Sequence, residues 1–202
     1  MRKFLSMSFG VLAVAIIVGV TAGAAKADPV TFSTTATFNG AASINFGGAT
    51  GVNLTFAGLT NSTVNSPSNT SLGEIVVSCA GVGGTGCSPQ NIGGTAFVIT
   101  ITQTVPGPTG TGTISSTLSG TIGGMTSSGT GITFTVTSAT INGVTYNILN
   151  NPLALVPVTT NNGRTSIQAA VTTIPEPTTM LLLGTGLIGV AGAFRRRFNS
   201  RP

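Results

Sequence analysis

Thr140-Ile141-Asn142-Gly143-Val144-Thr145 is the stretch that decides the fold of this 202-residue chain. An Asn-Gly pair accepts the positive φ angles of a type I′ turn, so the backbone reverses direction there as a tight hairpin. On both sides of the turn, apolar and polar residues alternate with a period of two, which is typical of half-buried strands. We expect a β-hairpin that pairs Ile132–Ile141 with Val144–Ile148.

The same alternation extends outward from the hairpin toward both ends of the chain. Gly and Pro interrupt it at intervals, and no long stretch with a period of 3.6 occurs outside the two apolar termini. The other expected strands are Val30–Phe38, Val52–Phe56, Leu72–Ser78, Ala96–Val105, Thr113–Ile122 and Ser166–Thr173.

Residues 28–173 are therefore predicted to form an all-β domain, an antiparallel β-sandwich of about 8–10 strands. A β-solenoid is the alternative that the repeated Thr-x-Thr pattern suggests, but the strand spacing is uneven and shows no constant repeat length. The core is expected to draw on Phe32, Phe38, Phe56, Phe97, Ile99, Phe134 and Val136.

The N-terminus has the pattern of a secretory signal peptide. Arg2 and Lys3 precede an apolar stretch, and Ala25-Lys26-Ala27 supplies the small-x-small pattern that signal peptidases cut. We predict a signal peptide over residues 1–27 that is cleaved before Asp28. An uncleaved N-terminal anchor is the alternative.

The C-terminus, residues 174–202, combines three elements. Pro175-Glu176-Pro177 is followed by an apolar run from Thr178 to Phe194 and then by Arg195-Arg196-Arg197. As a helix at ~1.5 Å per residue the run is about 25 Å long, which is at the short end of what can cross a bilayer. The arginines are expected to stay on the cytoplasmic side, so residues before Pro175 lie outside. The prolines keep the outer flank extended and accessible to a processing enzyme.

This arrangement, from about Ile174 to Arg201, resembles the PEP-CTERM tail of bacterial surface proteins, which exosortase recognises. The resemblance implies that the helix anchors the precursor in the inner membrane only transiently, and that processing near the Pro-Glu-Pro removes it. Such proteins are associated with Gram-negative bacteria that make extracellular polysaccharide, biofilm or floc. An ordinary single-pass anchor is the alternative.

Three segments of the domain are similar to the ectodomains called choice-of-anchor domains. They are FNGAASINFGG at residues 38–48, LGEIVVSC at residues 72–79 and GTGTISSTLSGTI at residues 110–122. This similarity implies a β-rich ectodomain and brings no known active site with it.

Cys79 and Cys87, the only cysteines, enclose a glycine-rich segment. In an exported domain such a pair predicts a disulfide, which stabilises by roughly 2–3 kcal/mol in the chain-entropy model. Free thiols or a redox pair are the alternatives, but C-x₇-C is not a redox motif. Gly81–Gly86 also has the G-x-G-x-x-G spacing, yet no acidic residue follows about 20 residues on, as dinucleotide binding requires.

Charge excludes several classes of function for the exported part. Its only charged side chains, Asp28, Glu74 and Arg164, give a formal charge of −1, so no basic patch exists to bind nucleic acid. The chain has no His, and its two exported carboxylates lie far apart in sequence. A serine nucleophile would lack a base, and the clusters that hold zinc or calcium are missing. We expect no catalytic residue, no cofactor and no metal.

Two function classes remain. The first is a structural or interaction protein of the cell surface or extracellular matrix, with the export machinery, an exosortase-like enzyme and extracellular polysaccharide as partners. The second is a lectin-like glycan-binding module. Glycan binding usually relies on aromatic platforms, and the single tyrosine, Tyr146, follows the hairpin turn, where cross-strand packing is the simpler interpretation. Arg164 is expected to be an exposed charge in a turn.

Overall fold

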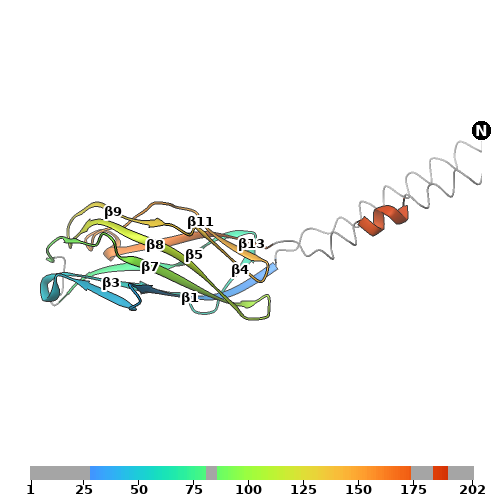
Figure 1. Ribbon diagram of the computed structural model, residues 1–202, viewed down its shortest axis with the longest axis horizontal. Coiled ribbons are helices and arrows are strands. Elements are labelled where there is room, and N and C mark those ends of the chain that lie inside the picture. The colour runs from blue at the N-terminus through green and yellow to red at the C-terminus, as the bar shows by residue number, and fades with distance from the viewer. Residues whose placement is uncertain (1–27, 81–85, 174–183, 191–202) are drawn as a thin grey trace, which may run out of the picture.

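Two β-sheets packed face to face form the body of the protein (Figure 1). The computed structural model describes residues 28–80, 86–173 and 184–190. Thirteen strands and two short 3₁₀ helices, η1 (Gly48–Thr50) and η2 (Asn161–Gly163), occur within the described residues 28–80 and 86–173. The strands are β1 (Asp28–Phe38), β2 (Ser43–Phe46), β3 (Val52–Ala57), β4 (Ser62–Ser66), β5 (Ser68–Cys79), β6 (Gln90–Asn91), β7 (Ala96–Val105), β8 (Gly110–Ile122), β9 (Ser127–Phe134), β10 (Ser138–Ile141), β11 (Val144–Ile148), β12 (Leu153–Ala154) and β13 (Arg164–Thr173).

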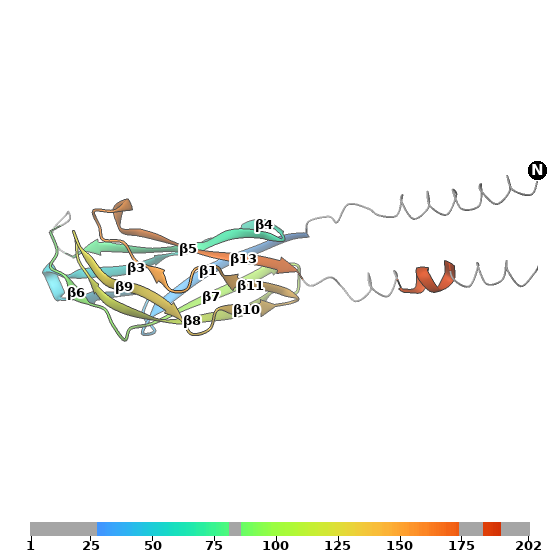
Figure 2. The same cartoon turned by 90° about the horizontal axis from the view of Figure 1, so that it is seen from above.

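The sheets differ in strand order, but every ladder in them is antiparallel. The first sheet has the order β12-β9-β8-β7-β1-β4, with β6 beside β8, and the second has the order β10-β11-β13-β5-β3-β2. Figure 2 shows the two layers from above. The predicted antiparallel β-sandwich is confirmed, and the solenoid alternative is not.

The core lies between the inner faces of the two sheets, as the alternation of apolar residues predicts. In β1, every second side chain from Val30 to Phe38 is buried. Aromatic rings from both sheets meet there: the centroids of Phe38 and Phe97 are 4.9 Å apart, and those of Phe56 and Phe97 are 5.8 Å apart. Such aromatic pairs add to the stabilisation from burial alone.

Thr34, a polar residue on an inward-facing position, joins the two sheets. Its hydroxyl donates to the carbonyl of Leu72 in the opposite sheet at 2.7 Å and accepts from the amide of Leu59 at 2.8 Å. A buried hydroxyl is costly unless it is hydrogen-bonded, and this one is paired as donor and as acceptor.

A β-bulge in β5 sets the position of Leu72. The register between β13 and β5 shifts there, so that Ile167 faces Gly73 while Gln168 faces Ser71. Gly73 has a φ of +125°, and a Cβ atom at this residue would lie 2.5 Å from the ring of Phe56. Only glycine meets both conditions without strain.

The Asn142-Gly143 turn has the predicted conformation, with φ angles of 47° and 77°. The predicted length of its first strand was wrong, because β10 begins at Ser138 and β9 belongs to the other sheet. Residues 135–137 carry the chain from one sheet to the other, and the amides of Thr135 and Val136 donate to the carbonyl of Ser115. Val136 is consequently 44% exposed and not a core residue.

The other expected core residues lie in or against the core. Phe56 is only partly buried, and the remaining members are buried: Phe32, Phe38, Phe97, Ile99 and Phe134. The strand count exceeds the prediction because several strands are very short or mostly polar. Among these are the two-residue strands β6 and β12 and the edge strand β4.

Candidate functional site

The described domain begins and ends at the same end of the sandwich. Asp28, the first residue of β1, pairs with Ser66, the last residue of β4. Thr173, the last residue of β13, donates its amide to the Ser66 hydroxyl at 2.8 Å. Figures 1 and 2 show the start of β1 and the end of β13 at one end of the molecule. We call this the tail end, and a signal peptide and a sorting tail would both attach there.

Three loops surround the point where β13 ends. Thr173 pairs with Val144, directly after the hairpin turn. The side-chain amide of Asn142 in that turn donates to the carbonyl of Pro108 in the loop between β7 and β8. The third loop connects β4 to β5 through Pro67. The tail end is thus a surface of turns rich in Pro, Gly and Asn, and Asp28 is the only ionisable residue that these strand ends and loops contain.

Beneath these loops, Tyr146 forms a buried hydrogen bond across the sandwich. Its hydroxyl donates to Oε1 of Gln103 at 3.0 Å, and Nε2 of Gln103 donates to the carbonyl of Pro106 at 3.2 Å. The ring packs edge-on against Phe32. Burial raises the pKa of Tyr146 above its ordinary value of 10.0. The side chain is fully buried, so it is a packing residue and cannot serve as a platform for a sugar.

The opposite end carries the predicted disulfide between Cys79 and Cys87. We call it the disulfide end. Cys79 closes β5, and the carbonyl of Cys87 accepts from the amide of Gly124, between β8 and β9 of the other sheet. Most of the enclosed glycine segment, residues 81–85, lies outside the described residues. The chain after Cys87 leads into β6 and not into a helix, which argues against a dinucleotide site.

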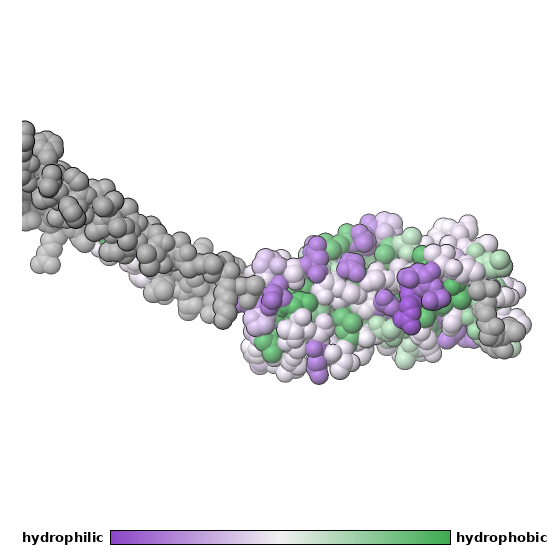
Figure 3. Space-filling view, turned by 180° about the vertical axis from the view of Figure 1, so that it is seen from behind, coloured by the Kyte–Doolittle hydropathy of each residue, from purple (hydrophilic) through white to green (hydrophobic). Residues whose placement is uncertain are grey.

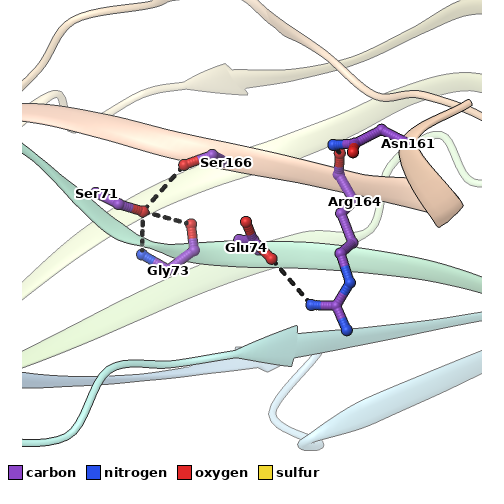
Figure 4. Close-up of polar contacts among 6 residues, drawn as sticks. All are labelled: Ser71, Gly73, Glu74, Asn161, Arg164 and Ser166. Carbon is purple, nitrogen blue, oxygen red and sulfur yellow. Dashed lines mark hydrogen bonds and ion pairs between the residues drawn. The ribbon is translucent and has the colours of Figure 1, made fainter.

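One ion pair lies on the outer face of the second sheet. Nη1 of Arg164 is 2.9 Å from Oε2 of Glu74, and both side chains are partly exposed (Figure 4). Asn161 donates to the backbone carbonyl of Arg164, while Ser71 and Ser166 share a hydrogen bond of 3.0 Å nearby. Arg164 was expected to be an exposed charge in a turn; it is exposed, but it is the first residue of β13. It is paired because it lies in β13, next to the strand that carries Glu74.

The described surface offers few groups that could recognise a ligand strongly. None of the large exposed apolar side chains within residues 28–80, 86–173 and 184–190 is aromatic. The same residues contain no group of three or more His, Cys, Asp or Glu side chains that could hold a metal ion. Figure 3 shows the back of the molecule, whose colours are pale over most of the described area, as expected for Thr, Ser and Gly.

Most of the predicted targeting residues lie outside the described part of the chain. These are Ala25 and Ala27 of the signal peptide, Pro175-Glu176-Pro177 and Arg195-Arg196-Arg197. Asp28, the predicted new N-terminus, is the first described residue. Within the predicted apolar run, residues 184–190 are helical and mostly exposed. No helix within the described residues has the length and apolar character needed to span a membrane.

Sequence reasoning missed Ser66 as a residue of this site. Only 2% of its surface is exposed, and its hydroxyl lies 3.3 Å from Oγ1 of Thr173 besides accepting from the Thr173 amide. The two residues are 107 positions apart in sequence. No local pattern in Ser62–Ser66 indicates this contact, because the segment contains a single apolar residue and sits at a sheet edge.

Comparison with known proteins identifies the tail. The PEP-CTERM protein-sorting motif matches residues 173–197, so it starts at the last residue of β13. This motif marks an exported protein whose C-terminal sorting tail is processed by an exosortase-type enzyme. No curated protein matches the chain, and no solved structure matches it.

Proposed function

We propose that this protein is a non-catalytic component of the bacterial cell surface or extracellular matrix, where its β-sandwich has a structural or interaction role associated with extracellular polysaccharide or biofilm. The signal peptide directs export and is removed before Asp28. The C-terminal helix then holds the precursor in the inner membrane until the exosortase-like enzyme acts near Pro175-Glu176-Pro177.

The observation that carries this proposal is the direct junction between the sandwich and the sorting motif at Thr173. The folded domain is thereby the cargo that the tail delivers. Its surface is consistent with a structural role, because the described part of the domain has one ion pair, few charges and many hydroxyl groups. Such a surface favours neighbours that are uncharged and rich in hydrogen-bonding groups.

A lectin-like module on the same scaffold has less support. The single tyrosine is buried, and the single arginine of the exported domain pairs with Glu74. Neither of the two residues considered for glycan contact is therefore free to form an aromatic platform or an unpaired cationic site. If the wild-type protein were retained on polysaccharide and the Arg164→Ala variant were not, this alternative would regain support.

The experiment compares the full chain with a deletion of residues 175–202 in a host that contains an exosortase. For the full chain we expect a membrane-bound precursor and a mature protein. The intact mass of the mature protein should correspond to a chain that begins at Asp28 and lacks Arg195-Arg196-Arg197. For the deletion variant we expect no membrane-bound precursor, because the helix and the arginines are gone.

A matched control replaces Arg195-Arg196-Arg197 with glutamines and leaves the Pro-Glu-Pro and the apolar run unchanged. Loss of membrane retention in this control would show that the arginine charges are what hold the precursor in the membrane. Equal distribution and equal mass in all three proteins, apart from the altered residues, would refute the sorting role. A folded protein in the cytosol with both termini intact would refute export.

A further inference from the structure

Only one residue, Ile174, separates the folded sandwich from Pro175-Glu176-Pro177. Thr173 itself is fixed, because it pairs with Val144 in the sheet and its amide donates to Ser66. A fully extended chain spans at most about 3.6 Å per residue, so the Cα atoms of Thr173 and Pro175 lie within about 7 Å of each other. Any cleft that closes around the Pro-Glu-Pro must therefore approach the end of the sandwich.

We propose that the tail end of the sandwich is a docking surface for the outward-facing part of the processing enzyme. This inference rests on the proposed function and adds to it the part of the domain that the enzyme contacts. The surface consists of exposed residues at the end of β4 and in the loops around Thr173: Asn65, Pro67, Gly107, Pro108, Thr109, Asn142 and Gly143.

These loops form one connected rim around the point where the tail leaves the domain. Asn142 is hydrogen-bonded to the carbonyl of Pro108, which ties the hairpin turn to the loop between β7 and β8. On the other side, Ser66 joins the loop between β4 and β5 to Thr173. The rim is braced from within by the Tyr146–Gln103–Pro106 hydrogen bonds. It is thus a hydrogen-bonded surface around Thr173, which lies only a few residues along the chain from the motif.

The charge of the rim favours a protein partner over the lipid surface. The rim residues include no Lys or Arg, and the carboxylate of the nearby Asp28 is offset by the α-amino group that signal-peptide cleavage leaves on the same residue. Anionic lipid headgroups attract segments rich in Lys or Arg, and this surface has neither residue. An uncharged surface of turns is compatible with shape-dependent docking on a folded enzyme.

The test introduces a charge into the rim and measures processing of the full chain in a host that contains an exosortase. Thr109→Arg and Thr109→Glu change an exposed residue without an assigned structural contact, so the fold should persist. We expect both variants to be processed about tenfold more slowly in a pulse-chase assay, because an unpaired charge must be desolvated at the interface. Asn65→Arg, on the other side of Thr173, provides a second position.

Thr50→Arg and Thr50→Glu are the matched controls, because Thr50 is an exposed threonine in η1 at the disulfide end. Their processing rates should stay within about twofold of wild type. The Cys79–Cys87 disulfide and the unfolding midpoint of each variant show whether the fold is intact.

A spacer provides the rescue. Eight Gly and Ser residues inserted after Thr173 move the domain away by about 16 Å on average. Under the proposal, the spacer chain carrying Thr109→Arg is processed as fast as the spacer chain alone. Equal rates for the Thr109 and Thr50 variants, or a defect that the spacer leaves unchanged, would overturn the docking surface.

Two further outcomes have separate meanings. Faster processing of Thr109→Arg together with slower processing of Thr109→Glu would overturn the proposal in favour of contact with anionic lipid. A wild-type chain that is not processed at all would reject the proposed function, and the docking surface with it. Slow processing of the rim variants alone leaves the proposed function intact and supports the docking surface.

Discussion

The tail end of the sandwich is closed by hydrogen bonds, whereas the disulfide end is closed by a covalent bond. At the tail end, Tyr146 reaches Gln103 across the core, and Ser66 holds the last residue of β13. At the other end, Cys79 and Cys87 join β5 to the loop that contacts Gly124. A hydrogen-bonded closure depends on the folded state alone, while a disulfide also restricts the unfolded chain. The two ends should therefore respond differently to mutation and to reduction.

The largest effect is expected at the tail end from Tyr146→Ala. This change removes a fully buried aromatic ring and its hydrogen bond to Gln103, which should lower the free energy of unfolding by about 3–5 kcal/mol. Denaturant titration followed by circular dichroism measures it. Hydrogen exchange should then accelerate first in β11 and at Pro106–Gly110, not near Cys79.

Tyr146→Phe separates the two contributions. It keeps the edge-on contact with Phe32 but leaves Oε1 of Gln103 without its donor, and we expect a loss of about 1–3 kcal/mol. If the Phe and Ala variants were equally unstable, the hydrogen bond rather than the ring would dominate the closure. If Phe had no effect, the cross-sheet hydrogen bond would be irrelevant to stability.

Removing the disulfide is expected to have the next largest effect. The double variant Cys79→Ala and Cys87→Ala should lose about 2–3 kcal/mol, because the short loop is no longer closed in the unfolded chain. Exchange should increase around residues 87–95 and 123–126, whereas β11 and β13 near Thr173 should stay protected. Equal loosening at both ends would contradict the independence of the two closures.

This contrast also marks what the sequence could and could not predict. The disulfide could be predicted because two cysteines in an exported chain have only one possible pairing. The hairpin could be predicted because an Asn-Gly pair strongly prefers the backbone conformation of a tight turn. The buried strand positions followed from alternation, as in Val30–Phe38. These are local signals, and each is carried by the residues that form the feature.

The hydrogen bonds that close the tail end could not be predicted from the sequence in the same way. Ser66 and Thr173 meet only because two sheets pack, and neither residue type indicates a partner 107 positions away. The alternation of apolar and polar residues continues through Val136, although the backbone has already left its sheet after Phe134. The predicted strand was therefore longer than the observed one. Period alone cannot show where a chain passes from one sheet to the other.

Alkaline pH should weaken the tail end selectively. Because burial raises the pKa of Tyr146 above 10.0, the stability linked to its proton is fully present below about pH 10 and is lost as pH rises above it. The loss approaches about 1.4 kcal/mol per pH unit while the folded phenol stays protonated. Denaturant titrations between pH 9 and pH 11.5 measure it.

Tyr146→Phe is the control for this dependence. The only lysines, Lys3 and Lys26, precede Asp28, so no lysine titrates in the domain. The stability of the Phe variant should therefore be nearly independent of pH over that range. A wild-type protein with the same flat profile would mean that Tyr146 is ionised as readily in the folded as in the unfolded chain.

The smallest effect is expected from the ion pair that belongs to neither closure. Glu74 and Arg164 are 37% and 49% exposed, and solvent screens such pairs, so Glu74→Gln should cost only about 0.5 kcal/mol. Most of that difference should vanish at 1 M salt, where the screening length is about 3 Å. Ser166→Ala, which removes the neighbouring hydrogen bonds to Ser71 and Gln168, is the salt-independent control.

A loss above about 2 kcal/mol in Glu74→Gln that persists at high salt would mean that the pair is a structural link between β5 and β13. Those strands run from one end of the sandwich to the other, so such a link would couple the two closures. Reduction of the disulfide would then also loosen Thr173. A weak, salt-sensitive pair leaves the hydrogen-bonded end and the covalent end energetically separate, which is what their different chemistry predicts.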